Sequence, residues 1–140
     1  GRKSAVTKAI EHYGLGDSVR FETGIDKLRL VELYAEAEIA VVPSLYEGFS
    51  LPAIEAMSCR VPVIATTAGA LPEVIGGAGI MVPPSDAGAL ASAIMRLLEN
   101  KSRRVELGSD GRRRVLERFT WRAAAEKTTA VYERAISDHG

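Results

Sequence analysis

The chain has 140 residues, of which 46% are hydrophobic and 26% charged, and its 18 basic and 18 acidic side chains cancel to a formal charge of zero. This composition is typical of one globular domain, the length is too short for two, and the neutral charge argues against a nucleic-acid partner. A single cysteine excludes an intramolecular disulfide, and one cysteine with two histidines cannot build a Cys/His zinc site.

The N-terminal part of the chain predicts two helices and two strands. Apolar side chains recur at helical spacing over residues 6–13, and Gly14 ends that helix. Residues 19–23 are expected to form a strand, and Asp26 can cap a second helix with a long apolar stripe. Residues 39–43 are apolar at every position, which is typical of a strand covered on both faces in a parallel sheet.

The rest of the chain continues this alternation. Pro52 lies in the first turn of a short helix that ends near Cys59, and Asn100 is expected to close a longer helix. The predicted strands are residues 61–65 and 79–82, and the predicted helices are residues 71–75, 86–99, 103–119 and 120–137. Strands alternating with helices predict an α/β fold, a doubly wound parallel sheet of about four strands, in one domain over residues 1–140.

The apolar runs are far shorter than the roughly 20 residues that cross a bilayer, so no transmembrane segment is expected. The lone Cys59 favours a reducing, cytoplasmic compartment, and the N-terminus has neither a signal-peptide pattern nor an initiator methionine, as in a chain cut from a longer one. Residues 101–122 hold eight basic side chains against three acidic ones. A solvated helix face is favoured for this excess over contact with a membrane or another domain.

The loop over residues 43–50 is the predicted ligand site, because ligands of open parallel sheets bind at the carboxyl ends of the strands. Gly48 lets the main chain approach a ligand closely. The amides of Phe49, Ser50 and Leu51, at the positive start of the following helix, are expected to point toward a phosphate. The loop therefore predicts a diphosphate site.

Two carboxylates, Glu47 and Glu55, flank this turn eight residues apart. Glu55 offers two acceptor oxygens to the hydroxyls of a ribose, and Glu47 is expected to meet sugar hydroxyls. A second wall with more main-chain donors near the phosphates is expected at the carboxyl end of the next strand, from Thr66, Thr67, Ala68 and Gly69. The alternatives are two unrelated surface acids, or a carboxylate pair of the glycosidase kind.

These motifs resemble the donor-binding half of the family-4-type retaining glycosyltransferases. Glu47 and Glu55 match the family's E-x7-E motif. The similarity covers nearly the whole chain, and its other motifs are the loop at 43–55, the strand at 61–65, Leu71-Pro72-Glu73-Val74, residues 79–83 and Phe119-Thr120-Trp121. The resemblance implies the C-terminal, Rossmann-like domain of a GT-B enzyme, with an acceptor-binding N-terminal domain as its partner.

By this resemblance, Glu55 holds the ribose of a nucleotide-sugar donor, and Glu47 holds the donor sugar as the catalytic residue. The amides of residues 48–51 surround the diphosphate, and the base lies near Thr23 and Gly24. The implied reaction transfers a sugar with retention of configuration to a saccharide, lipid or small-molecule acceptor. It requires no metal ion and no cofactor, because preorganised hydrogen-bond donors stabilise the departing nucleoside diphosphate.

The sequence departs from the family pattern in three places. Ser50 replaces a second glycine, and its hydroxyl can cap the following helix. Arg60 stands where glycine is usual, so a left-handed conformation there would be strained. The family's basic pair and two strands ahead of this segment are missing, and Arg2 and Lys8 are poor replacements. The isolated chain is therefore expected to be inactive, and its open sheet edge could exchange strands with a second copy.

Two other functions stay open at this stage. One is a sugar-nucleotide epimerase of the same fold, which gives no reason for the glutamate spacing. The other is a non-catalytic module that senses nucleotides or binds another protein.

Overall fold

The computed structural model describes residues 4–45 and 50–119. The chain divides into two compact units, residues 1–30 and residues 31–140, and each is described by itself. Glu47, Gly48 and Phe49 lie outside the described residues, as does the helix predicted over residues 120–137.

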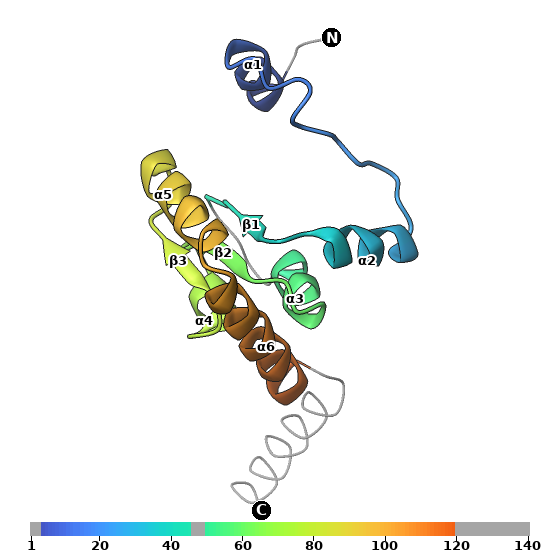
Figure 1. Ribbon diagram of the computed structural model, residues 1–140, viewed down its shortest axis with the longest axis vertical. Helices are drawn as coiled ribbons and strands as arrows, with labels where there is room; N and C mark the ends of the chain where they lie inside the picture. Colours follow the sequence, from blue (N-terminus) through green and yellow to red (C-terminus); the bar gives the residue numbers. More distant parts are fainter. Residues whose placement is uncertain (1–3, 46–49, 120–140) are drawn as a thin grey trace, which may run out of the picture. The chain divides into compact units, whose positions relative to one another are not determined.

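The first unit holds helix α1, Ala5–His12, and an extended segment that leads into α2, Lys27–Glu36 (Figure 1). The hydroxyl of Ser4 accepts the Thr7 amide at 3.1 Å and caps α1. Gly14, with a φ of +66°, follows the helix end, as predicted. Asp26 caps α2 by accepting the Arg29 amide at 2.8 Å.

The strand predicted over residues 19–23 does not form. These residues are extended but pair with no strand among the described residues, and the Phe21 side chain is 63% exposed. An alternating apolar pattern stabilises a strand only where a neighbouring strand completes its hydrogen bonds.

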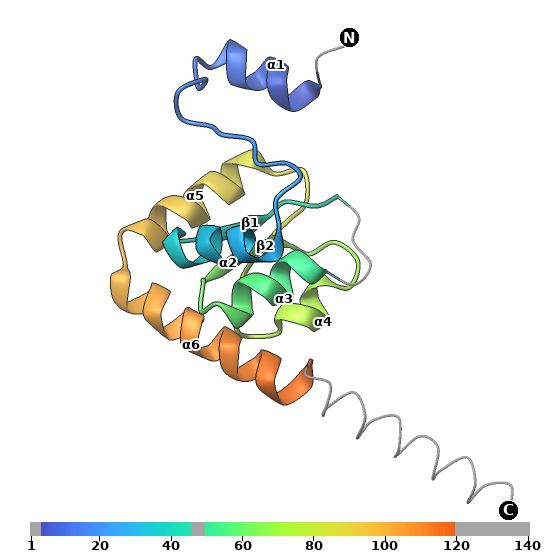
Figure 2. The same cartoon turned by 90° about the vertical axis from the view of Figure 1, so that its right-hand side faces the viewer.

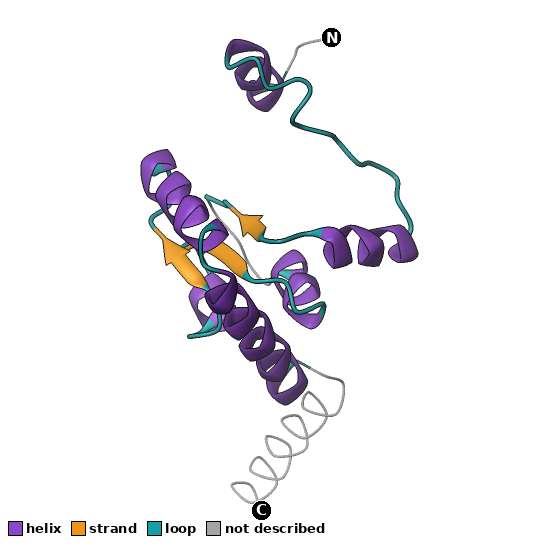
Figure 3. Ribbon diagram, in the orientation of Figure 1, coloured by secondary structure: helices purple, strands orange, loops and turns teal. Residues whose placement is uncertain are grey.

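The second unit is built on a parallel sheet of strands β1, Ala40–Val42, β2, Val63–Thr66, and β3, Ile80–Val82 (Figure 3). The described residues thus contribute three strands in the order β1-β2-β3, one fewer than predicted. Val41 pairs in register with Ile64. Because β1 is at an edge of the described sheet, Val41 is 37% exposed, and the prediction that this strand is covered on both faces is wrong.

The central strand β2 is buried at every position, with helices on both faces of the sheet (Figure 2). Val63 and Ala65 pack with residues of α3, Leu51–Ser58, and α4, Leu71–Ile75. Ile64 points to the opposite face and packs with Leu97 of α5, Ala87–Leu98. Successive side chains of a strand alternate between faces, so β2 contributes to two apolar cores and the doubly wound prediction is confirmed.

Helix α6, Lys101–Arg118, begins at Asn100, whose side chain accepts the Arg103 amide at 3.0 Å. The prediction that Asn100 closes the preceding helix is confirmed, since its amide donates to the Leu97 carbonyl at 3.2 Å, and the same residue also caps α6. The predicted start of α5 is confirmed, since Asp86 accepts the Ala89 amide at 2.9 Å.

Three arginines of α6 each donate to the carbonyl end of another helix. The last carbonyls of a helix have no partner within it, and a guanidinium can satisfy them. The bonds run from Arg104 to Leu97 O at 2.9 Å and Leu98 O at 2.5 Å, from Arg112 to Ser58 O at 2.7 Å, and from Arg114 to Glu73 O at 2.5 Å and Val74 O at 2.8 Å. The basic stretch is therefore not simply a solvated face, because α6 closes the ends of α5, α3 and α4.

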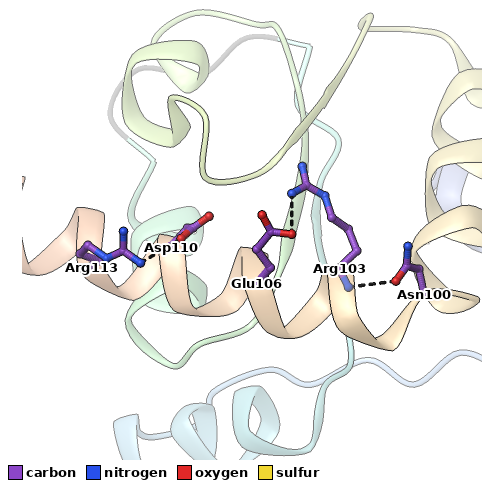
Figure 4. A network of polar contacts seen from close by, with 5 residues as sticks. All are labelled: Asn100, Arg103, Glu106, Asp110 and Arg113. Atoms are coloured by element: carbon purple, nitrogen blue, oxygen red, sulfur yellow. Dashed lines mark hydrogen bonds and ion pairs between the residues drawn. The ribbon is translucent and has the colours of Figure 1, made fainter.

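Other arginines of α6 form ion pairs along its exposed face (Figure 4). Arg103 pairs with Glu106 at 3.1 Å, and Arg113 with Asp110 at 3.1 Å. For these residues the predicted solvated face is confirmed. Such exposed pairs contribute at most about 1 kcal/mol each.

Candidate functional site

The loop that follows β1 is tied to the carboxyl end of β2. The Thr66 hydroxyl donates to the Ser44 carbonyl at 2.5 Å, and Thr66 is only 3% exposed. Both strands run parallel, so this bond holds the start of the loop at the edge where their carboxyl ends meet. The predicted loop thus begins at the carboxyl ends of the strands, where ligands of open parallel sheets bind.

The start of α3 supplies a buried cap below this loop. Ser50 is fully buried, and its hydroxyl accepts the Ala53 amide at 3.3 Å, which confirms the predicted capping role. The Ser50 carbonyl accepts the Ile54 amide, and Pro52 has no amide hydrogen. The Leu51 amide, at the positive end of α3, has no hydrogen-bond partner among the described residues.

Glu55 lies in the second turn of α3, half buried, and faces α2. The Tyr34 hydroxyl lies 3.5 Å from Glu55 Oε2 and 3.4 Å from the Pro52 carbonyl oxygen. One hydroxyl hydrogen is thus shared between a carboxylate and a helix carbonyl. The carboxylate keeps acceptor capacity for a ligand, since its two oxygens offer about four lone-pair positions.

The environment of Tyr34 favours its protonated form. Burial raises the pKa of Tyr34 above its ordinary value, and the negative charge of Glu55 and the hydrogen bond to it raise the pKa further. Tyr34 therefore stays a hydrogen-bond donor at neutral pH. Sequence reasoning missed this residue because it counted Tyr34 only as part of the apolar stripe of α2, although its hydroxyl was a visible signal.

The second predicted wall is only partly available. The Thr67 amide donates to the Val82 carbonyl at 3.0 Å, which extends the pairing of β2 with β3, so this amide is not free for a phosphate. The prediction of a donor from the Thr67 main chain is wrong, although its side chain is exposed at the correct edge. Gly69 is exposed, with a φ of +52° that suits glycine.

The remaining predicted site residues lie in the first unit or outside the described residues. Thr23 and Gly24 belong to the first unit, and Gly24 has a φ of +61°. Glu47, Gly48 and Phe49 lie outside the described residues, so the pairing of Glu47 with Glu55 stays a prediction.

A cavity of about 290 Å³ opens at the same edge of the sheet, toward α5. The last residues of β2 and β3 and the segment that follows β1 contribute to its walls, and Ser85 lies in the wall with a φ of +58°. It is lined by Pro43, Leu45, Thr66, Val82, Pro83, Ser85, Asp86, Ala87 and Leu90. Sequence reasoning missed this cavity, since its lining comes from segments far apart in the chain.

Comparisons with known proteins identify the family of this chain. The family described as glycosyl transferases group 1 matches residues 1–114. The MMP alpha-(1->4)-mannosyltransferase of Mycolicibacterium hassiacum is 46% identical over 133 residues, which are 93% of this chain and 32% of that protein. The chain therefore belongs to the glycosyl transferases group 1 family.

Solved structures agree with this membership. The sucrose-phosphate synthase of Thermosynechococcus elongatus is 41% identical with a TM-score of 0.83, over 95% of this chain and 34% of that one. The C-terminal domain of a glycosyl transferase group 1 protein of Francisella tularensis is 29% identical with a TM-score of 0.69, over 81% of this chain and 60% of that one. The fold is that of the GT-B glycosyltransferases.

The chain spans about a third of the length of the mannosyltransferase that it matches. Among the described residues, no helix is both long enough and apolar enough to cross a membrane.

Proposed function

We propose that the chain is the donor-binding half of a retaining glycosyltransferase and that its site takes a nucleoside diphosphate sugar. The observation that carries this proposal is the position of Glu55 beside the capped start of α3, at the carboxyl edge of a parallel sheet. An anion at this helix start would meet the Leu51 amide and the positive end of the helix dipole. Glu55, one helical turn further on, would then accept hydrogen bonds from the ribose.

The proposed chemistry is the departure of the nucleoside diphosphate, stabilised by preorganised donors, followed by attack of an acceptor on the same face of the sugar. Glu47 holds the donor sugar in this scheme. The acceptor is bound by a partner domain. Neither a metal ion nor a cofactor takes part in this scheme. A mannosyl donor is supported by the printed activity of the Mycolicibacterium hassiacum relative. The proposal also places the protein in the cytoplasm, either free or in peripheral contact with a membrane.

Calorimetry with UDP, GDP, ADP and their sugar conjugates tests the donor site. Replacing Glu55 by alanine should weaken the best ligand about tenfold or more, since hydrogen bonds to a charged group contribute about 1.5–3 kcal/mol. Glu73→Ala is the matched control, because Glu73 is an exposed glutamate in the first turn of α4. Binding that is indifferent to Glu55→Ala, or absent in the wild type, overturns the proposed site and favours an interaction module.

The reaction class needs a separate experiment on the complete protein. Nuclear magnetic resonance should show that the product keeps the anomeric configuration of the donor. An inverted product contradicts the retaining mechanism. Conversion of the sugar nucleotide into its epimer without an acceptor identifies the epimerase alternative.

A further inference from the structure

The Tyr34 hydroxyl is the one side-chain donor within hydrogen-bond distance of the Glu55 carboxylate among the described residues. The two residues are 21 positions apart in the sequence and come from α2 and α3. Their contact is therefore made by the tertiary fold and not by local helix geometry.

The tyrosine ring fixes the position of this hydroxyl. Tyr34 is half buried and packs against the apolar core that contains Ala53, Met57 and Val63. A tyrosine has few rotatable bonds, whereas a glutamate is among the side chains that lose most rotamer freedom when ordered. Tyr34 therefore has fewer ways to reorient its donor than Glu55 has to reorient its carboxylate.

The distances indicate that the donor is shared in the absence of ligand. The hydroxyl oxygen lies 3.4 Å from the Pro52 carbonyl oxygen and 3.5 Å from Glu55 Oε2, and both are long for an O–H···O bond. A single hydrogen can serve either acceptor. When the hydroxyl hydrogen is donated to Glu55 alone, the bond holds Oε2 toward α2 and leaves Oε1 for a ligand.

We propose that Tyr34 is a positioning residue for nucleotide binding, whose hydroxyl orients the Glu55 carboxylate toward the ribose hydroxyls. This inference rests on the proposed function of the same site. It assigns the role to a residue that touches Glu55 and not the nucleotide. Its signature is a loss of affinity that depends on the ribose hydroxyls.

The raised pKa of Tyr34 supports this role, because burial and the charge of Glu55 both favour the protonated, donating form. The same charge makes the bond to Glu55 Oε2 stronger than a neutral one. A ligand that orders the carboxylate therefore also favours donation of the Tyr34 hydrogen to Glu55 over donation to the Pro52 carbonyl.

The test compares UDP and GDP with their 2′,3′-dideoxy forms, which lack both ribose hydroxyls. Tyr34→Phe keeps the ring and removes only the hydroxyl. In calorimetry on the complete protein, it should weaken the preferred ribonucleotide about threefold to tenfold, the usual net effect of one hydrogen bond. Affinity for the dideoxy form should stay within about twofold of the wild-type value. An equal loss for both forms, or no loss for the ribonucleotide, overturns the positioning role.

Two further variants complete the design. In a Glu55→Ala background, Tyr34→Phe should cause no additional loss, because the oriented group is already gone. Tyr13→Phe is the matched control, since Tyr13 is an exposed tyrosine that follows α1. Thermal unfolding of each variant separates a folding defect from a binding defect. If Glu55→Ala leaves ribonucleotide affinity unchanged, the proposed donor site itself is overturned. If Glu55→Ala weakens binding but Tyr34→Phe does not cause the expected ribose-dependent loss, only the positioning role of Tyr34 is overturned.

Discussion

Gly108 of α6 lies directly against the main chain of Arg60. A β-carbon built at Gly108 would overlap the Arg60 carbonyl oxygen and stand 3.1 Å from its carbonyl carbon. Arg60 itself has a φ of +63°, a left-handed conformation that is strained for a residue with a side chain. Close approach of α6 to this turn is possible only without a side chain at position 108.

Replacing Gly108 by alanine should therefore lower the free energy of unfolding by about 1–3 kcal/mol, the usual cost of overpacking a rigid contact. Urea unfolding measures the change. Gly88→Ala is the control, because its β-carbon would stand 3.6 Å from the Asp86 side chain in an exposed turn of α5. That variant should be neutral or stabilising by up to about 1 kcal/mol. Equal stability of the two variants contradicts the close contact.

The guanidinium of Arg114 should matter more than that of its neighbour Arg113. Arg114→Met removes donors from two carbonyl oxygens of α4, which should cost about 1–3 kcal/mol in chemical unfolding. Arg113→Met removes an exposed pair with Asp110 and should cost less than about 1 kcal/mol. A larger loss for Arg113→Met would show that the helix-end bonds contribute little.

Ser50→Ala should destabilise the chain by about 1 kcal/mol, because the amide of Ala53 loses its capping partner. Ser92→Ala, at an exposed position within α5, should change stability by less than about 0.5 kcal/mol. Thermal and urea unfolding measure both variants. Hydrogen exchange should also be faster at the start of α3 in Ser50→Ala, and unchanged exchange there argues against the cap.

Alkaline pH should weaken the fold through Tyr34. Its pKa is raised in the folded state, so the folded chain holds this proton more tightly than the unfolded chain does. The resulting stability is fully present below the ordinary tyrosine pKa of about 10 and is lost as the pH rises through the raised folded value. Tyr34→Phe should reduce the loss of unfolding free energy as the pH rises above about 10.

Glu55 provides the internal check on this pH effect. Since its charge contributes to the raised pKa of Tyr34, Glu55→Gln should lower the pH at which an ultraviolet titration detects Tyr34 ionisation. An unchanged titration would assign the shift to burial alone.

The sequence correctly predicted those elements that depend on residues close together in the chain. The apolar run at residues 61–65 gave the buried central strand, and Asp86 gave the start of α5. The strand predicted over residues 19–23 failed because a strand depends on a partner that its own sequence does not encode. Asn100 ends α5 as predicted, but its second role as the cap of α6 was missed, since asparagine suits both helix ends.

The candidate site shows the same division. Ser50 and Pro52 carry local signals, and their positions at the start of α3 were predicted correctly. The Thr67 amide was assigned to a ligand, but the pairing of β2 with β3 extends far enough to occupy it. The bond from Tyr34 to Glu55 joins two helices, so only the packed structure could identify it.

Helix α3 has Glu55 in its second turn, and its opposite end accepts from Arg112 at the Ser58 carbonyl. A helix of eight residues is only about 12 Å long. The bond from Arg112 therefore ties α6 to the far end of the same short helix whose second turn holds Glu55.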